Sequence, residues 1–324
     1  MLDIVITHYR EPWEICRRQF LMLDMQRRVD WKEIRVTIIN DGGYRLPEEE
    51  LKALRFRWKA KDFTAVDLPH GGISRARNAG IDLGTEPWIM FCDCDDSFSN
   101  IYALEDIMNV IRSPGADRYD MLWTKCYQED ADGSIGMVPQ FKTFVFCHGK
   151  AYRRKFLLDE GIRFPEDLPM NEDSCFNNVI IARTQKVAEI RSHAPVYSWL
   201  RRTGSVTTRP EAVDLGAVCQ VRRNMIVTEE NRLHREAEYP SMVTRAAYDV
   251  FYMIHGKRIS GSCKQEILAM FVPWMKERAD QFGKVPEDIL DKIRDVSRCE
   301  LLEADEQVQD SHETVWEWVR RLGE

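Results

Sequence analysis

Residues 89–99 read IMFCDCDDSFS, so a run of apolar and thiol side chains ends in three carboxylates, Asp93, Asp95 and Asp96. A short apolar run bounded by polar residues is typical of a buried strand. Acidic residues are also common at strand ends, where they cap the helix that follows. For an isolated Asp-x-Asp that simpler interpretation is preferred, so the surrounding sequence has to decide between a cap and a binding site.

Strand-like and helix-like segments alternate along the first 111 residues. Short β-branched or apolar runs end near residues 7, 39, 68 and 92. Each run is followed by a polar loop and an amphipathic stretch, at 13–25, 48–57, 74–83 and 101–111. This βαβα order predicts an α/β fold with a mostly parallel sheet flanked by helices. Because such sheets bind ligands at the carboxyl ends of their strands, we expect the functional residues directly after each run.

The strand pattern stops at about residue 211. Amphipathic segments then predict helices at 212–231, 241–255, 264–282, 286–296 and 314–322, with Pro240, Pro273 and Pro286 as interruptions of the helical pattern. We therefore expect a catalytic domain at 1–210 and a helical C-terminal region at 211–324. Within the first we expect a nucleotide-binding half at 1–97 and an acceptor half at 98–210. The helical region carries no motif, and it could bind the acceptor, form a homo-oligomer or dock on a larger carrier.

Composition limits the classes of function. The 324 residues carry a net charge of −7, which gives no overall attraction to nucleic acid or to an anionic membrane. The nine cysteines are scattered without a Cys-x-x-Cys pair, which indicates reduced thiols. No window approaches the ~18 apolar residues of a membrane span. We expect a cytoplasmic protein without a transmembrane segment, and peripheral membrane contact remains open.

Acids and glycines gather at the predicted strand ends. Asp41 follows the second run, Asp93 ends the fourth, and the glycine-rich stretch 70–72 precedes a helix. Clustered carboxylates repel each other unless a cation lies among them, and a glycine-rich helix start suits phosphate. Mg²⁺ or Mn²⁺ together with a nucleoside diphosphate would satisfy both demands. An EF-hand is excluded because Phe98 and Leu104 stand where Gly and Glu are needed, and no Gly-x-Gly-x-x-Gly follows the first run.

Four motifs follow the four predicted strands in order: THYR at 7–10, NDGG at 40–43, LPHGGISRARNAGIDLG at 68–84 and WIMFCDCDDSF at 88–98. Together they resemble the amino-terminal half of the family 2 glycosyltransferases, which have the GT-A fold. The resemblance implies a metal-dependent, inverting enzyme that uses Mn²⁺ or Mg²⁺ and a nucleotide-diphosphate sugar. A UDP-sugar is the default donor because it is common in that family. Asn40 and Gly43 depart from the usual second turn.

The resemblance also assigns roles to residues of the first half. Asp41 would lie at the nucleotide base, and Arg77 near the base or the diphosphate. Asp93 would contact the ribose or the metal, and Asp95 would be the principal metal ligand. The remaining donor contacts that it implies are Thr7, Tyr9, Arg10, Gly42 and Asn78.

Residues 147–207 resemble the acceptor region of the same family. Glu172 and Asp173 open a predicted helix, where capping is the simpler interpretation, but the family's Glu-Asp motif implies that Asp173 is the general base, with Glu172 beside it. Arg202 and Ser205 resemble a segment that closes over the donor. Weaker candidates for contact with the acceptor are His148, Lys150 and Trp199.

The predicted acceptor is a hydroxyl of a glycan, a cell-wall precursor or another macromolecule. A modified nucleic-acid base is a less favoured acceptor because the chain is acidic. Two other classes stay open. One is a catalytically silent protein that binds a nucleotide or glycan. The other is a nucleotidyltransferase, although residues 7–13 lack the glycine-rich loop that such enzymes carry after the first strand.

Overall fold

A computed structural model describes the 324 residues except 44, 139–144, 203–208, 210–211, 303–305 and 324. The chain forms two compact units, Met1–Thr203 and Gly204–Glu324. The predicted boundary after residue 210 lies outside the described residues and stays a prediction. The predicted division at 97/98 falls inside the short strand β5 (Ser97–Phe98).

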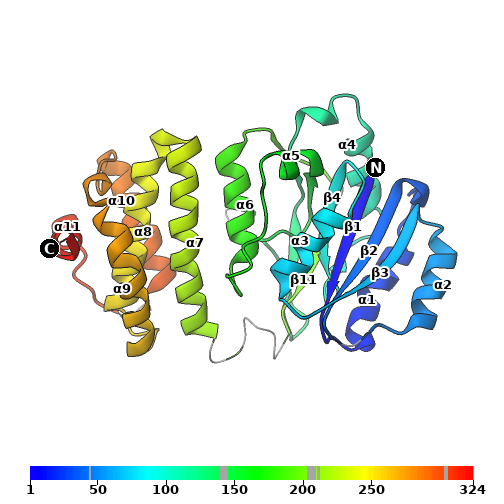
Figure 1. The fold of residues 1–324 in the computed structure, drawn as a ribbon, viewed down its shortest axis with the longest axis horizontal. Helices are drawn as coiled ribbons and strands as arrows, with labels where there is room; N and C mark the ends of the chain where they lie inside the picture. Colours follow the sequence, from blue (N-terminus) through cyan, green and yellow to red (C-terminus); the bar gives the residue numbers. More distant parts are fainter. Residues whose placement is uncertain (44, 139–144, 203–208, 210–211, 303–305, 324) are drawn as a thin grey trace. The chain divides into compact units, whose positions relative to one another are not determined.

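The first unit is built on a seven-stranded sheet of order β10-β6-β9-β4-β1-β2-β3. Its strands β4, β1, β2 and β3 are labelled in Figure 1. Of the strands in this sheet only β9 runs against its neighbours, so the prediction of a mostly parallel sheet is confirmed. The strands are β1 (Leu2–His8), β2 (Ile34–Asp41), β3 (Asp62–Leu68), β4 (Trp88–Asp93), β6 (Met121–Trp123), β9 (Lys150–Arg153) and β10 (Val187–Glu189).

Strand register brings the ends of the predicted motifs to one edge of the sheet. Thr7 on β1 lies opposite Asp93 on β4, and His8 lies opposite Asn40 on β2. Asp41 in turn lies opposite Leu68 at the end of β3. All seven residues of β1 are buried, as expected for the centre of a parallel sheet that is covered on both faces. The carboxyl edge of the sheet therefore collects the polar residues that follow the strands.

Helices flank this sheet, and all of them except α5 lie close to predicted positions. They are α1 (Trp13–Asp24), α2 (Glu48–Trp58), α3 (Ile73–Leu83), α4 (Ala103–Arg112), α5 (Arg154–Asp159) and α6 (Glu172–Arg183). One glycine explains a close approach: a Cβ at Gly80 on α3 would lie 2.5 Å from Val5 Cγ1 on β1. Gly80 therefore allows α3, the helix that carries Arg77, to lie directly against β1.

A second, four-stranded sheet has the order β5-β11-β7-β8. It consists of β5, β7 (Cys126–Glu129), β8 (Ile135–Met137) and β11 (Tyr197–Leu200). Residues 93–96, which we call the acidic turn, lead from β4 directly into β5. The next helix, α4, begins only at Ala103 and has no side-chain cap. The three aspartates are therefore not helix caps, and the turn instead joins the two sheets.

The described residues of the second unit form helices and no strands. Its α-helices are α7 (Ala212–His234), α8 (Tyr239–His255), α9 (Gly261–Lys276), α10 (Glu287–Leu301) and α11 (His312–Gly323). This confirms the predicted helical C-terminal region. The interruption expected at Pro273 does not occur, because Pro273 lies inside α9. The helix keeps this unfavourable residue while Phe271, Trp274 and Met275 are buried around it. Among the described helices of the chain, none is both long and apolar enough to span a membrane.

Candidate active site

Asp93 lies at the centre of the carboxyl edge and is held from three directions. Arg77 Nη2 on α3 donates to its two oxygens at 2.9 and 3.1 Å. The Thr7 hydroxyl donates to Oδ1 at 2.9 Å, and His148 Nε2 lies 3.1 Å from Oδ2. Burial alone would raise the pKa of Asp93, but Arg77 and His148 hold it below its ordinary value. Asp93 is therefore a fixed, ionised carboxylate.

Asp96 completes a group with Asp93 and His148. Its Oδ2 lies 3.6 Å from His148 Nε2, while the Leu200 amide donates to its Oδ1 at 2.9 Å. Burial raises the pKa of Asp96 well above its ordinary value, against the opposing effect of His148. Burial lowers the pKa of His148, but the two aspartates outweigh it and raise that pKa well above its ordinary value. A proton on His148 thus neutralises part of the acidic charge.

The same three residues could hold a metal ion. Among the described residues they are the one group whose ligand atoms all lie within 4.8 Å of one another. Asp96 Oδ2 is buried and has no hydrogen-bond partner in the described part of the chain, and His148 Nε2 faces both carboxylates. Two carboxylates and an imidazole are ligands that Mn²⁺ accepts. The donor set therefore fits a divalent cation that replaces the proton of His148.

Asp95, which we predicted as the principal metal ligand, has a different partner. Arg202 donates to its Oδ2 at 2.7 Å and to Glu11 Oε1 at 3.3 Å. Glu11 Oε2 also accepts the amides of Tyr9 and Arg10, at 3.0 and 3.2 Å. Glu11 was missed in the sequence, although an acid directly after the first motif was the available indication. The metal role of Asp95 stays a prediction, and Ser205 lies outside the described residues.

Asp41 lies at the end of β2 and organises the glycine-rich loop. Its Oδ1 accepts the Gly71 amide at 2.7 Å, and its Oδ2 accepts the Gly72 amide at 2.9 Å. His70 Nδ1 lies 2.9 Å from the same Oδ2. The loop amides that we expected to bind phosphate are therefore directed to Asp41. The turn at Gly42, with φ of +63°, makes this possible, because a Cβ there would lie 2.2 Å from the His70 nitrogen.

Tyr9 and its neighbours form a ring cluster beside this loop. The Tyr9 and His70 rings are stacked with centroids 4.3 Å apart, and the Arg10 guanidinium lies 5.0 Å from the Tyr9 centroid. Asn78 points elsewhere: its side chain donates to the Phe164 carbonyl and accepts the Phe164 amide, both at 2.9 Å. Asn78 therefore fixes the chain before α6, and its predicted contact with the donor stays a prediction.

Glu172 and Asp173 open α6 on the other side of Arg77. Arg77 Nη1 donates to Glu172 Oε1 at 2.8 Å, so one buried guanidinium joins Glu172 to Asp93. Burial and the neighbouring Asp173 raise the pKa of Glu172 to about 7, against the effect of Arg77. Asp173 is half-buried, its Oδ1 accepts the Ser174 amide at 2.7 Å, and burial raises its pKa. Asp173 is therefore the carboxylate of the pair that is less engaged by Arg77.

The raised pKa of Glu172 predicts a pH dependence of stability. A folded-state pKa of about 7, against 4.5 in the unfolded chain, means that only the folded state keeps this proton between those values. The free energy of unfolding therefore loses up to ~3 kcal/mol from this group as pH rises from 4.5 to 7. Glu172→Gln removes this loss, so its unfolding free energy relative to wild type should increase between pH 5 and pH 8.

Urea unfolding of the full chain at several pH values measures this difference. Glu50→Gln is the matched control, because Glu50 is an exposed residue of α2. A constant difference between Glu172→Gln and wild type across this range would contradict the raised pKa.

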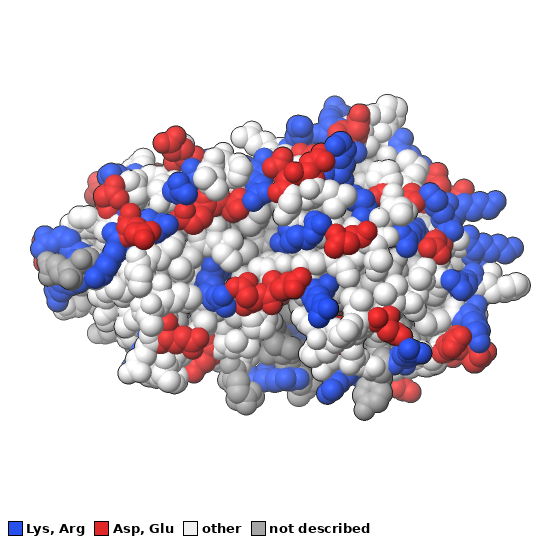
Figure 2. Space-filling view, in the orientation of Figure 1, with Lys and Arg blue, Asp and Glu red and all other residues white. Residues whose placement is uncertain are grey.

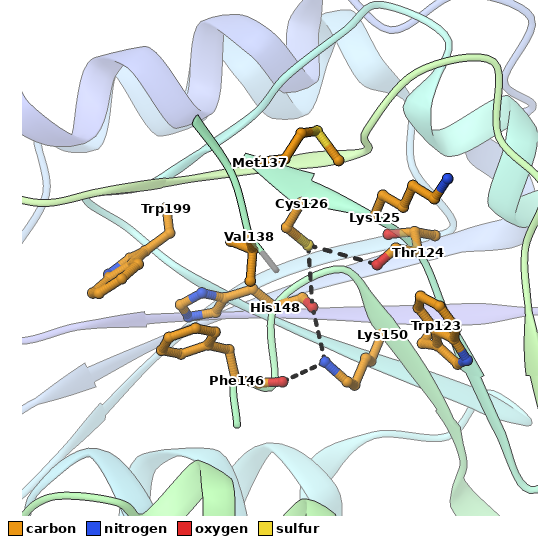
Figure 3. Close-up of a pocket in the computed structure, with 10 residues that line it drawn as sticks. All are labelled: Trp123, Thr124, Lys125, Cys126, Met137, Val138, Phe146, His148, Lys150 and Trp199. Atoms are coloured by element: carbon orange, nitrogen blue, oxygen red, sulfur yellow. Dashed lines mark hydrogen bonds between the residues drawn. The ribbon is translucent and has the colours of Figure 1, made fainter. Parts of the chain in front are cut away.

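The three predicted acceptor residues lie together in a cavity of about 270 Å³ (Figure 3). His148 belongs both to this cavity and to the group around Asp93. Lys150 donates to the carbonyls of Phe146 and His148, and burial lowers its pKa. The Trp199 ring lies 4.8 Å from the Phe146 ring. The described lining residues are Trp123, Thr124, Lys125, Cys126, Met137, Val138, Phe146, His148, Lys150 and Trp199.

Comparisons with known proteins show similarity over almost the whole chain. A relative from Bacillus subtilis (strain 168), the "uncharacterized glycosyltransferase EpsJ", is 20% identical over 330 residues, which cover 93% of this chain and 85% of the relative. The crystal structure of S. aureus TarS 1–349 in complex with UDP has a TM-score of 0.66 at 16% identity, covering 99% of this chain and 91% of that one. TarS 1–349 in complex with UDP-GlcNAc has a TM-score of 0.64 at 17% identity with the same coverage.

These structural similarities confirm the predicted GT-A fold. The family model described as glycosyl transferase family 2 matches residues 3–164, which is half of the chain. That match spans the edge that carries Asp41, Asp93, Asp95 and Asp96, and it confirms the resemblance drawn from the motifs. The chain belongs to glycosyl transferase family 2 and is a glycosyltransferase.

Proposed function

We propose that this enzyme transfers a sugar, with inversion, from a nucleoside diphosphate sugar to a hydroxyl of a glycan, a cell-wall precursor or another macromolecule. The observation that carries the proposal is the double contact of Arg77, which lies 2.9 Å from Asp93 and 2.8 Å from Glu172. Arg77 thereby joins the end of β4, where we expect the donor, to the start of α6, where we expect the general base. Donor and acceptor can therefore meet within one site.

The donor nucleotide is proposed to lie along the carboxyl edge of the sheet. Its base lies near Asp41 and the stacked rings of Tyr9 and His70, and its ribose lies near Asp93. Arg202, beside Asp95, supplies a cation for the diphosphate. A uridine nucleotide is the proposed donor, which is supported by the UDP and UDP-GlcNAc complexes of TarS 1–349.

A divalent cation, Mn²⁺ or Mg²⁺, is proposed as the cofactor. Asp93, Asp96 and His148 would hold it, with Asp95 as the alternative ligand from the sequence. When bound, such an ion would neutralise charge on the departing diphosphate. The histidine in the ligand set favours Mn²⁺ over Mg²⁺, because Mg²⁺ prefers oxygen ligands.

Asp173 is proposed as the general base. Its carboxylate takes the proton of the acceptor hydroxyl while that oxygen attacks the anomeric carbon and the bond to the diphosphate breaks. The raised pKa of Asp173 makes it a stronger base than an exposed aspartate. Glu172 accepts a hydrogen bond from Arg77 and so keeps the guanidinium in place. When ionised, Glu172 also adds negative charge beside Asp173.

The aromatic cavity is the proposed acceptor site. Rings such as Trp199 and Phe146 suit the apolar faces of a sugar, and His148 and Lys150 offer polar contacts. A nucleic-acid acceptor is less favoured. On the face shown in Figure 2, basic and acidic side chains are interspersed over the catalytic unit, whereas nucleic-acid binding favours a continuous basic surface.

Binding of nucleoside diphosphates tests the proposed donor and cofactor. We expect UDP with Mn²⁺ to raise the unfolding free energy by about 2.7 kcal/mol at a hundredfold excess over Kd. Asp96→Asn should abolish the part of this gain that depends on Mn²⁺ if Asp96 is a ligand. Asp95→Asn should abolish the same Mn²⁺-dependent gain if Asp95 and Asp93 are the ligands, as the resemblance implies.

Thermal unfolding with UDP, GDP, CDP and thymidine diphosphate, each with and without Mn²⁺, measures these gains. Asp117→Asn is the matched control, because Asp117 is an exposed residue of the short helical turn Ala116–Arg118, which precedes β6. Lack of any gain with all four nucleotides would contradict the proposed function.

A further inference from the structure

His70 is a part of the nucleotide edge to which the motifs assign no role. Its side chain is 54% exposed, whereas that of Asp41 is only 6% exposed. Asp41 already accepts three N–H groups, from His70, Gly71 and Gly72. A carboxylate that is buried and engaged in this way is poorly placed to contact a base itself. The exposed group at this point is the imidazole.

The contact with Asp41 fixes which nitrogen of a neutral His70 carries the proton. An ionised carboxylate only accepts hydrogen bonds, so Nδ1, at 2.9 Å from Asp41 Oδ2, is the donor. Nε2 then carries a lone pair on the far edge of the ring. Among the described residues Nε2 has no hydrogen-bond partner, and the hydrogen bond of the ring runs through Nδ1.

The ring is also held in a fixed position. Its face is stacked on Tyr9 at 4.3 Å with an angle of 17° between the planes. Two glycines allow this close assembly: a Cβ at Gly42 would lie 2.2 Å from the His70 nitrogen, and one at Gly43 would lie 1.6 Å from the Tyr9 carbonyl oxygen. A hydrogen-bond acceptor is thus presented to solvent in a set orientation beside a flat aromatic surface.

We propose that His70 reads the base of the donor nucleotide by accepting a hydrogen bond at Nε2 from a ring N–H of that base. This inference rests on the proposed function. The matching groups are N3–H of uracil or thymine and N1–H of guanine. Cytosine N3 and adenine N1 carry lone pairs instead, so they would face the lone pair of Nε2 without a proton between them. Asp41 then acts by orienting His70.

The discrimination between UDP and CDP measures this contact. We expect the full chain to bind UDP roughly tenfold more tightly than CDP, which is the effect of about one neutral hydrogen bond. His70→Phe keeps a ring for stacking on Tyr9 but removes both nitrogens, so the ratio of the two Kd values should fall close to one. His70→Gln returns an acceptor at a similar reach and should keep part of the preference.

Isothermal titration with UDP, GDP, CDP and ADP gives the Kd values. His193→Phe is the matched control, because His193 is also exposed and also contacts an aspartate, Asp106, through Nδ1 at 3.2 Å. A GDP preference that His70→Phe removes would support the same contact with guanine.

Two other results separate this inference from the proposed function. If UDP binds but both His70 variants keep the wild-type ratio of UDP to CDP, the inference is wrong and the proposed function stands. If no nucleoside diphosphate binds to the wild-type chain, both are wrong.

Discussion

Asp173→Asn should lower kcat by a factor on the order of 10²–10⁴ while it leaves the Kd of the donor nucleotide nearly unchanged. Asparagine has the same shape but cannot take a proton from the acceptor hydroxyl. The side-chain oxygen of the variant can still accept the Ser174 amide, as Asp173 Oδ1 does at 2.7 Å, so α6 should begin as before. Steady-state transfer rates, together with titration of the nucleotide, separate the two effects.

Glu172→Gln is the matched comparison for this prediction, because Glu172 is the adjacent carboxylate. It is paired with Arg77 and its pKa is raised to about 7, so its removal changes the charge near the base without removing the base. We expect a smaller loss of kcat than in Asp173→Asn. If Glu172→Gln costs the larger factor and Asp173→Asn is nearly wild type, Glu172 is the base.

The pH dependence of kcat is a second test of Asp173 as the general base. Because burial raises the pKa of Asp173, the rate should decline with falling pH at a higher pH than for an ordinary aspartate. The sign follows from the role: protonation of Asp173 removes the base, so activity is present above its pKa and lost below it.

Much of the fold could be predicted from the sequence because the relevant information is local. Four strand-like runs with intervening amphipathic stretches predict a parallel sheet, and parallel strands end at one edge. That is why Thr7, Asp41 and Asp93 could be placed together although they are far apart in the chain. Pro273 shows the limit of local patterns, since the packing of α9 outweighs a residue that usually ends a helix.

The partners within the site could not be predicted, because they depend on how distant loops meet. Arg202 and Glu11, which are separated by 191 positions, meet beside the acidic turn. His148 reaches Asp93 from 55 positions away. The sequence gives no rule for such pairings. The resemblance implied Asp95 and Asp93 as metal ligands, and the structure groups Asp93 with Asp96 and His148, so Asp93 is common to both sets and the role of Asp95 stays a prediction.

Arg77→Met should be among the most destabilising single changes in the catalytic unit. Arg77 is buried and its guanidinium binds Asp93 and Glu172, and it also lies 5.3 Å from the Phe164 ring centroid. Loss of one partner from a buried charged group typically costs about 3–5 kcal/mol, because the remaining charges stay buried without compensation. Methionine keeps most of the apolar volume, so the loss reports the charge. Urea unfolding of the full chain measures it.

Arg163→Met is the matched control, since Arg163 pairs with Asp82 through side chains that are 35% and 60% exposed. Such a surface pair contributes only about 0–1 kcal/mol. The cost of Arg77→Met should be smaller at pH 5 than at pH 8, because Glu172, with its pKa raised to about 7, is neutral at pH 5 and needs the cation only when it is ionised at pH 8. Arg77→Lys should recover little, since an ammonium cannot bind two carboxylates in the fixed geometry of a guanidinium. A cost for Arg77→Met as small as that of Arg163→Met would mean that Asp93 and Glu172 do not depend on this cation, and the joining of the donor and acceptor sides through Arg77 would have to be abandoned.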